Sequence, residues 1–286
     1  MNWDSAFACD QESQFLAAPH GARPAPGTAL VRKLEVRWAS CEADVRQAQR
    51  LRYLVFAQEM GARIAPPAGT AAGLEADRFD PFCDHLLVTA TTGDGTSLLA
   101  GTYRVLPPGA AQRAGGLYID TEFDLAPLAS LRSKAVELGR SCVHPAWRSG
   151  GVIMALWTAL GQYMLVRGLD TMIGCASVSL GQGRGQGHGG QTAENLWSSL
   201  QHTHLVDQQW QIRPLYPLPL NALASAGDTR GKKGNTPPLI KGYLRCGARL
   251  LGPPALDVAF NTADLPMLLR TDDLHPRYRK HFMGAR

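Results

Sequence analysis

The chain has 286 residues, of which 45% are hydrophobic, and a formal net charge of +5. This length suits one large globular domain or two small ones, and no apolar run approaches the roughly 18 residues of a membrane-spanning helix. The six cysteines form no C-x-x-C pair, which indicates reduced thiols in the cytoplasm and argues against a zinc site. The positive charge favours anionic partners such as phospholipid, nucleic acid or an acidic carrier protein.

The N-terminal part of the chain divides into an arm and the start of a folded domain. Residues 1–30 are rich in Ala, Pro and Gly and have no hydrophobic periodicity, which predicts a flexible arm without the features of a signal peptide. Residues 31–286 are then expected to form a single domain. Alternating side chains predict a strand over residues 34–39, and apolar residues at helical spacing predict a helix over residues 42–60, ended by Gly61.

This helix and the acidic segment after it carry candidate binding residues. Arg52 and Phe56 are four residues apart and therefore share a face of the helix, although a solvated arginine would show the same spacing. Asp77, Asp80 and Asp84 place three carboxylates within eight residues. They could bind an ammonium group or support Arg52, or form a solvated loop. A metal site is disfavoured, because a hard cation needs more oxygen ligands than this pattern provides.

A strand, a glycine turn and a helix form the centre of the sequence. Strands are predicted over residues 86–89 and 98–106, and the apolar residues of 136–143 predict a third strand that Pro145 ends. Gly150 and its neighbours then open a helix with one buried face. Free backbone N–H groups at such a helix N-terminus can bind a phosphate; a core strand–turn–helix without a ligand is the alternative.

The C-terminal half continues the alternation. A strand is predicted over residues 171–180, a mobile glycine-rich surface loop over 181–190, a helix over 193–204, a basic loop over 221–238 and a helix over 239–251. No βαβ unit begins at the glycine-rich loop, so its G-x-G-x-x-G match does not indicate a dinucleotide site. The predicted fold class is α/β (α+β mixed), with a central mixed sheet flanked by helices and an embellished C-terminal half.

Several separated motifs point to one family. Residues 137–145, Glu-Leu-Gly-Arg-Ser-Cys-Val-His-Pro, followed by Arg-Ser-Gly-Gly at 148–151, resemble the central motif of the bacterial ornithine N-acyltransferases. That family is similar to the acyl-homoserine-lactone synthases, and both belong to the GNAT acyltransferase superfamily. The resemblance covers about residues 31–283 and includes, in the same order, residues 51–56, 77–85, 118–125, 238–245 and 260–264. It implies a GNAT-like acyltransferase fold.

The resemblance implies a reaction as well as a fold. The expected activity is transfer of a fatty acyl group, a 3-hydroxyacyl group in particular, from an acyl carrier protein thioester to the α-amine of L-ornithine. The products would be lyso-ornithine lipid and holo carrier protein. No cofactor is expected, since the acyl-phosphopantetheine arm belongs to the substrate. The expected location is the cytoplasm, with peripheral contact at the inner membrane.

Three alternatives stay open. The chain could be an N-acyl amino acid synthase with another amine acceptor, or an acyl-homoserine-lactone synthase, although that family is shorter and needs a site for S-adenosylmethionine. It could also be a catalytically dead GNAT-like protein that binds carrier protein or membrane. A nucleic-acid partner is not expected, because the basic residues are not interleaved with aromatic ones on one element.

Glu137 is the candidate general base for the amine. Burial in an apolar strand should raise the pKa of its carboxyl group, although a structural ion pair with an arginine is the alternative. Regular alternation places Glu137 and Arg140 on opposite faces. A bulge near Gly139 would bring them together and free an N–H group for the thioester oxyanion. Cys142 is interpreted as a buried strand cysteine and not as a nucleophile.

The donor loop departs from the GNAT pattern Arg/Gln-x-x-Gly-x-Gly/Ala at one position. Arg148 and Gly151 match it, but Ile153 replaces the last small residue, which suits a phosphopantetheine donor that lacks a nucleotide. Taken with the resemblance, the predicted site has no metal. Its catalytic residues are Glu137, Arg140 and Arg104. Its donor-binding residues are Val143, Arg148, Gly150 and Gly151. Its acceptor-binding residues are Arg52, Phe56, Asp77, Asp80 and Asp84.

Overall fold

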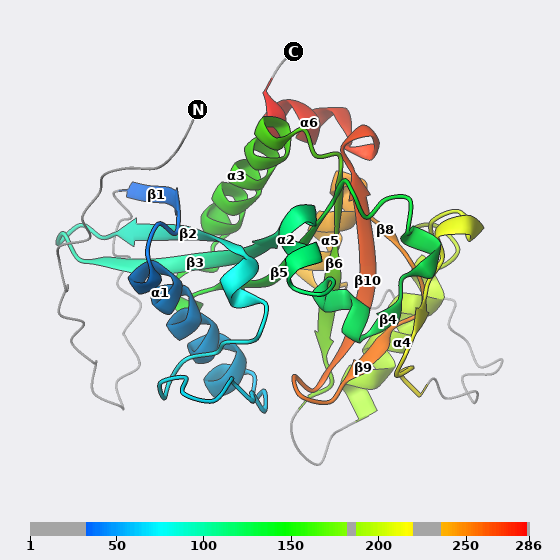
Figure 1. The fold of residues 1–286 in the computed structure, drawn as a ribbon, viewed down its shortest axis with the longest axis horizontal. Helices are drawn as coiled ribbons and strands as arrows, with labels where there is room; N and C mark the ends of the chain where they lie inside the picture. Colours follow the sequence, from blue (N-terminus) through cyan, green and yellow to red (C-terminus); the bar gives the residue numbers. More distant parts are fainter. Residues whose placement is uncertain (1–32, 182–186, 220–235, 285–286) are drawn as a thin grey trace.

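One mixed β-sheet runs through the computed structural model, which describes residues 33–181, 187–219 and 236–284 (Figure 1). In these residues the strand order is β1-β2-β3-β5-β6-β10-β8, with β9 paired to β10. The pair β5–β6 is parallel and the other pairs are antiparallel. The strands are β1 Lys33–Trp38, β2 Asp84–Thr91, β3 Ser97–Leu106, β5 Ala135–Val143, β6 Thr171–Ser179, β8 Arg249–Leu250, β9 Ala255–Asp257 and β10 Thr262–Arg270. A separate two-stranded sheet pairs β4 Phe123–Asp124 with β7 Arg213–Pro214.

The helices surround this sheet. The α-helices are α1 Glu42–Arg52, α2 Pro108–Arg113, α3 Gly151–Arg167, α4 Gly187–Leu200, α5 Pro238–Cys246 and α6 Pro276–Met283. A π-helical segment, η1 Tyr53–Glu59, continues α1. Short 3₁₀ turns are η2 Asp80–Phe82, η3 Tyr118–Thr121, η4 Ala126–Leu128, η5 Pro145–Trp147, η6 Gln208–Trp210 and η7 Thr271–Asp273. None of the described helices is long and apolar enough to cross a membrane.

The mixed α/β architecture predicted from the sequence is confirmed, with local differences. The helix expected over residues 239–251 is wrong at its end: α5 stops at Cys246, because Gly247 adopts a left-handed φ of 113° and β8 follows. Strand β10 was not predicted. The predicted arm, residues 1–30, and most of the basic loop over 221–238 lie outside the described residues.

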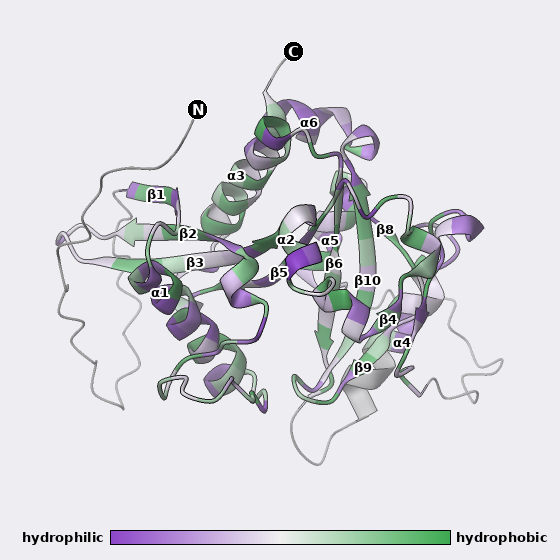
Figure 2. Cartoon of the chain, in the orientation of Figure 1, coloured by the Kyte–Doolittle hydropathy of each residue, from purple (hydrophilic) through white to green (hydrophobic). Residues whose placement is uncertain are grey.

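The two faces of the sheet pack against different helices. In β2, Leu86 and Val88 belong to the core cluster that contains the buried residues of α3, whereas Leu87 belongs to the cluster of α1. Since successive strand residues point to opposite faces, α1 and α3 cover opposite faces of this part of the sheet. We call these the α1 face and the α3 face. Apolar residues concentrate in the sheet interior and along α3 (Figure 2).

A bulge in β5 changes which residues share a face. Thr102 pairs with Cys142 and Arg104 with Gly139, so that two residues of β5 oppose the single residue Tyr103 of β3. The bulged residue Arg140 has a left-handed φ of 50°. The bulge expected from the sequence is therefore present and includes Arg140. As a result Arg140 joins Glu137 on the α1 face.

Strands β5 and β6 separate after a short contact. Their parallel pairing runs from Ala135 opposite Thr171 to Glu137 opposite Ile173 and ends there. Beyond this point β6 stays paired with β10 along its full length, while β5 stays paired with β3. The sheet consequently splits between β5 and β6. A Cβ atom at Gly174, at the apex of the split, would lie 2.2 Å from the carbonyl oxygen of Leu138.

The close approach at the apex of the split predicts that only glycine fits at position 174 without a loss of stability. Gly174→Ala should destabilise the protein by about 1–3 kcal/mol, because the new methyl group would force the two backbones apart. Gly139→Ala is the matched control, since a Cβ there meets no atom within 4 Å. Urea unfolding curves would measure both variants. Equal midpoints for the two variants would contradict a close approach at Gly174.

Candidate active site

Three arginines and three carboxylates form a closed ring of ion pairs on the α1 face. Arg52 contacts Glu75 at 2.5 Å and Asp80 at 2.6 Å. Arg104 contacts Asp80 and Asp77, each at 2.7 Å. Arg140 closes the ring to Glu75 at 3.0 Å and to Asp77 at 3.2 Å. Positive and negative side chains alternate around this charge ring, and each has two partners of opposite sign.

Protein surrounds the charge ring almost completely. Arg52 is fully buried, and Asp80 and Arg104 are nearly so. Burial opposes ionisation of Asp80, but the charges of Arg52 and Arg104 outweigh it and lower the pKa of that carboxyl group. The pKa of Asp77 is lowered in the same way, against burial, by Arg104 and Arg140. The carboxylates of Asp77 and Asp80 are therefore ionised at neutral pH.

A polar cavity lies beside the charge ring at the split of the sheet. Its lining is drawn from β3, η3, β5, β6 and β10. It consists of Arg104, Leu106, Tyr118, Glu137, Leu138, Gly139, Arg140, Cys175, Ser177 and Asp264. The aromatic ring of Tyr118 lies 4.4 Å from the Arg140 guanidinium carbon and 5.8 Å from that of Arg104. The three residues predicted as catalytic thus line one cavity.

Glu137 is a titratable group of this cavity whose pKa lies near neutrality. One carboxylate oxygen accepts the backbone N–H of Tyr118 at 2.6 Å, and the other accepts that of Ile119 at 2.8 Å. Burial raises the pKa of Glu137 to about 7, although these two hydrogen bonds and Arg104 act to lower it. Among the described residues Glu137 forms no ion pair, so the geometry does not support a structural pair with an arginine.

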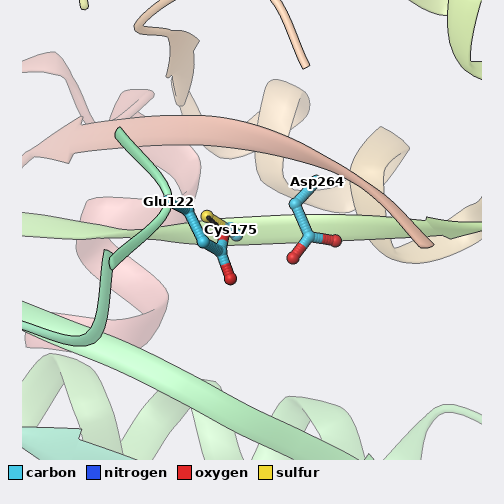
Figure 3. Close-up of side chains that lie close together, drawn as sticks. All are labelled: Glu122, Cys175 and Asp264. Carbon is cyan, nitrogen blue, oxygen red and sulfur yellow. Dashed lines mark hydrogen bonds between the residues drawn. The ribbon is translucent and has the colours of Figure 1, made fainter. Parts of the chain in front are cut away.

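Two further acidic side chains lie close together beside the cavity, which Asp264 lines. Glu122, Cys175 and Asp264 have ligand atoms within 4.8 Å of one another, and both carboxylates point to one side of β6 (Figure 3). The Cys175 thiol donates to Glu122 Oε2 at 3.5 Å. The Thr262 hydroxyl donates to Asp264 at 2.9 Å. None of these three residues is among the predicted site residues, although Glu122 and Asp264 lie in segments that carry the family resemblance.

An apolar cavity lies on the α3 face, behind the same split. Its lining comes mainly from α3, β6, α5, β10 and α6. It includes Trp157, Leu160, Met172, Ile173, Ala176, Tyr243, Ala248, Met267 and Phe282. Leu138 and Cys175 line both cavities. The polar and apolar cavities therefore meet where β5 and β6 separate.

The predicted donor-binding residues lie at the N-terminus of α3. Gly150 caps this helix with a left-handed φ of 100°, and Gly151 is its first residue. Arg148 donates to the Val143 carbonyl at 3.2 Å and pairs with both carboxylate oxygens of Glu59 at 2.5 and 2.7 Å. The structure brings these four predicted residues together, and a phosphate would compete with Glu59 for Arg148.

The predicted acceptor-binding residues do not gather in one place. Arg52, Asp77 and Asp80 are members of the charge ring, and none of them lines the polar cavity. Of the two roles expected for the carboxylates, the geometry supports the pairing with Arg52. Phe56 packs edge-on against Phe260, with ring centroids 5.7 Å apart. Asp84 is partly exposed, and it accepts from Tyr163 at 2.7 Å and pairs with Arg167.

Cys142 is unsuited to nucleophilic attack. Its side chain is buried on the α1 face, and burial raises the pKa of the thiol to about 12. Only the thiolate is a strong nucleophile. This placement agrees with the interpretation of Cys142 as a buried strand cysteine.

The chain is similar to several known proteins. Residues 51–158 match the family described as the acetyltransferase (GNAT) domain. The chain is 33% identical to the L-ornithine N(alpha)-acyltransferase of Rhizobium meliloti (strain 1021), over 98% of this chain and 94% of that protein. It is 35% identical to the protein of the same name from Brucella abortus (strain 2308), over 87% and 88% of the two chains. The solved structure of FeeM, an N-acyl amino acid synthase from uncultured soil microbes, aligns with a TM-score of 0.49 at 13% identity, covering 86% and 98%.

The GNAT match and the identities define the protein as an N-acyltransferase with a GNAT-like fold. Within this class the chain belongs to the family of the L-ornithine N(alpha)-acyltransferases. The family resemblance inferred from the sequence motifs is confirmed.

The charge ring predicts a large stability cost for losing one member. Asp80→Asn should destabilise the protein by about 3–5 kcal/mol at neutral pH, because it leaves two buried arginines short of a partner. Asp84→Asn, a partly exposed carboxylate nearby, should cost no more than about 1 kcal/mol. Since the folded-state pKa of Asp80 lies below its ordinary value, its contribution should be present above that value and disappear as pH falls. Denaturant unfolding across acid and neutral pH would measure this, and similar costs for both variants would contradict the ring's importance.

Proposed function

We propose that this enzyme transfers a fatty acyl group from an acyl carrier protein thioester to the α-amine of L-ornithine. The products are lyso-ornithine lipid and holo carrier protein. The observation that carries the proposal is the position of Glu137, in a polar cavity that meets an apolar cavity at the split between β5 and β6. Family membership supports ornithine as the acceptor.

The two cavities divide the substrates by polarity. The acyl chain occupies the apolar cavity, because burial of apolar surface is its main source of binding energy. The amino acid enters the polar cavity, where the guanidinium groups of Arg104 and Arg140 favour its carboxylate. The thioester carbonyl then lies at the split, next to backbone N–H groups of β5 that have no sheet partner on the β6 side. Such N–H groups stabilise a developing oxyanion.

Glu137 completes the chemistry as a general base. In its ionised form it takes a proton from the α-ammonium or α-amine, directly or through a water molecule. The amine nitrogen attacks the thioester carbon, a carbon–nitrogen bond forms, and the carbon–sulfur bond breaks. The thiolate leaves with little need of protonation, since its pKa is far below that of an amine. No cofactor enters this proposal.

The donor arm is proposed to enter along α3. A phosphopantetheine phosphate suits the N-terminus of this helix, where free N–H groups and Arg148 favour an anion. Peripheral membrane contact is proposed at the other end of α3. Val166 is 85% exposed there, next to Arg167, and α6 contributes further basic side chains. Apolar and basic residues side by side favour an anionic membrane surface.

Replacement of the base tests the proposed function. For the wild-type enzyme kcat/KM should rise with pH through an inflection near 7, because Glu137 acts only when ionised. Glu137→Gln should lower turnover by about 10²–10⁴ at neutral pH, and the loss should shrink at alkaline pH, where the amine deprotonates unaided. Purified enzyme, acyl carrier thioester and L-ornithine, with the product measured by mass spectrometry, provide the assay.

This variant needs a folding control. Both oxygens of Glu137 accept N–H groups, so the amide nitrogen of glutamine would face a donor and cost about 1–3 kcal/mol of stability. The thermal midpoint of the variant should therefore be compared with the assay temperature. A folded variant with wild-type turnover at neutral pH would exclude Glu137 as the base.

The ion pair between Arg148 and Glu59 leads to a second prediction, which concerns binding of the acyl donor. Arg148→Ala should raise KM for acyl carrier protein with a smaller effect on kcat, because it removes a phosphate contact used in binding. Glu59→Gln should lower the same KM, since it releases Arg148 from its ion pair. Steady-state kinetics would distinguish this from a structural pair, for which both variants should change KM in the same direction.

A further inference from the structure

The acidic cluster of Glu122 and Asp264 adjoins the polar cavity through Asp264, and the proposed chemistry does not use it. Asp264 lines the cavity, and on β10 it pairs in register with Ser177 of β6, another lining residue. Glu122 reaches the cluster from the segment between η3 and β4. Its side chain is more than nine-tenths buried, and its Oε1 atom has no hydrogen-bond partner. An unsatisfied buried carboxylate oxygen is costly for the free protein.

The cluster differs from the charge ring in having no ion pair among the described residues, although the charge of Arg140 acts to lower the pKa of both carboxyl groups. None of the ion pairs found in the described residues includes Glu122 or Asp264, whereas each ring carboxylate has two arginine partners. Burial, followed by repulsion from Asp264 and Asp257, raises the pKa of Glu122 to about 8. The pKa of Asp264 is raised as well, again mainly by burial. A cation supplied from outside would relieve both effects.

We infer that Glu122 and Asp264 bind the side-chain ammonium group of the acceptor and so select a diamino acid over a neutral one. This inference rests on the proposed function, which assigns the polar cavity to the amino acid acceptor. The acceptor would lie across the polar cavity, with its α-amine at Glu137, its carboxylate near Arg104 and Arg140, and its second amine at the acidic cluster. An ammonium group carries three N–H donors, which suits the free Glu122 Oε1 and the Asp264 carboxylate.

The arrangement also explains which amine reacts. A side-chain amine held between two carboxylates is stabilised in its charged form, and a charged ammonium has no lone pair for attack. The α-amine lies beside a single carboxylate whose pKa is near neutrality, so it can lose its proton there. The acidic cluster thus keeps the side-chain amine protonated, whereas Glu137 allows the α-amine to lose its proton.

A metal ion suits the cluster less well than an ammonium group. Cys175 is the third ligand that a metal would use, and a coordinating sulfur must be a thiolate. Burial and the neighbouring carboxylates raise the pKa of Cys175 well above its ordinary value, and its thiol donates to Glu122. The cysteine is therefore a neutral hydrogen-bond donor that orients Glu122.

Two substrates of the same carbon skeleton test the inference. L-Norvaline is L-ornithine without the terminal amine, so the ratio of the two kcat/KM values isolates recognition of that amine. For the wild type the ratio should be at least about 100, because norvaline leaves the buried carboxylates unpaired. Glu122→Gln and Asp264→Asn should each lower the ratio at least tenfold, mainly through KM for ornithine.

A matched control and a folding control accompany these variants. Asp170→Asn removes a partly exposed carboxylate that pairs with Lys134 just before β6, and it should leave the ratio unchanged. Thermal unfolding at pH 8 should show Glu122→Gln and Asp264→Asn to be at least as stable as the wild type, since each removes a buried acidic group that has no ion-pair partner among the described residues. Folded variants that keep the wild-type ratio would overturn the inference. A stoichiometric metal in the purified wild type that is absent from both variants would also overturn it.

If the proposed function is wrong, the experiment gives a result that differs from failure of the inference alone. If the wild type acylates neither amino acid, the acceptor assignment is wrong, and ligand-induced thermal shifts still decide the role of the cluster. Ornithine should then stabilise the wild type but not Glu122→Gln, while norvaline stabilises neither. Equal shifts by ornithine in the two proteins would count against ammonium binding at this cluster.

Discussion

The closed ring of alternating charges is the interaction on which the site depends. It joins α1, the segment before β2, and strands β3 and β5. Because its positive and negative side chains alternate, it places two arginines at the edge of the polar cavity together with the carboxylates that pair with them. Burial raises the pKa of Glu137 to about 7, although two backbone hydrogen bonds and the charge of Arg104 act to lower it. A stronger positive field would hold the carboxylate ionised but make it a weak base.

The sheet itself separates polar from apolar chemistry. Strand alternation places Arg104 on one face of β3, where it lines the polar cavity, and Tyr103 on the other face, where it lines the apolar cavity. The parallel pairing of β5 and β6 ends early, and the bulge at Arg140 brings that side chain to the face of Glu137. One split thus connects two cavities that the rest of the sheet keeps apart.

Local signals in the sequence account for much of this arrangement. The carboxylate of Glu137 in an apolar strand, and the need for a bulge to bring it near Arg140, could both be read from residue order. The same signal exists at Asp264, but it was missed because residues 262–270, with Pro266 in their middle, were not recognised as a strand. The partners of Arg52 lie 23 and 28 residues away, and no local pattern specifies such contacts.

The end of α5 shows a different cause of error. Periodic basic and apolar residues continue past Cys246, but Gly247 provides a left-handed stop that overrides them. Glu122 was overlooked for a third reason. It stands in a short irregular segment, where hydrophobic periodicity carries no information about burial.

A closed ring of charges also constrains how this sequence can evolve. Each member serves two neighbours, so a change of sign or length at one position affects two pairs at once. Such coupled positions are not additive, and a second substitution has an effect that depends on the first. A single substitution at one of these six residues therefore leaves two partners unpaired. Substitutions that do become fixed in the ring should occur as concerted sets.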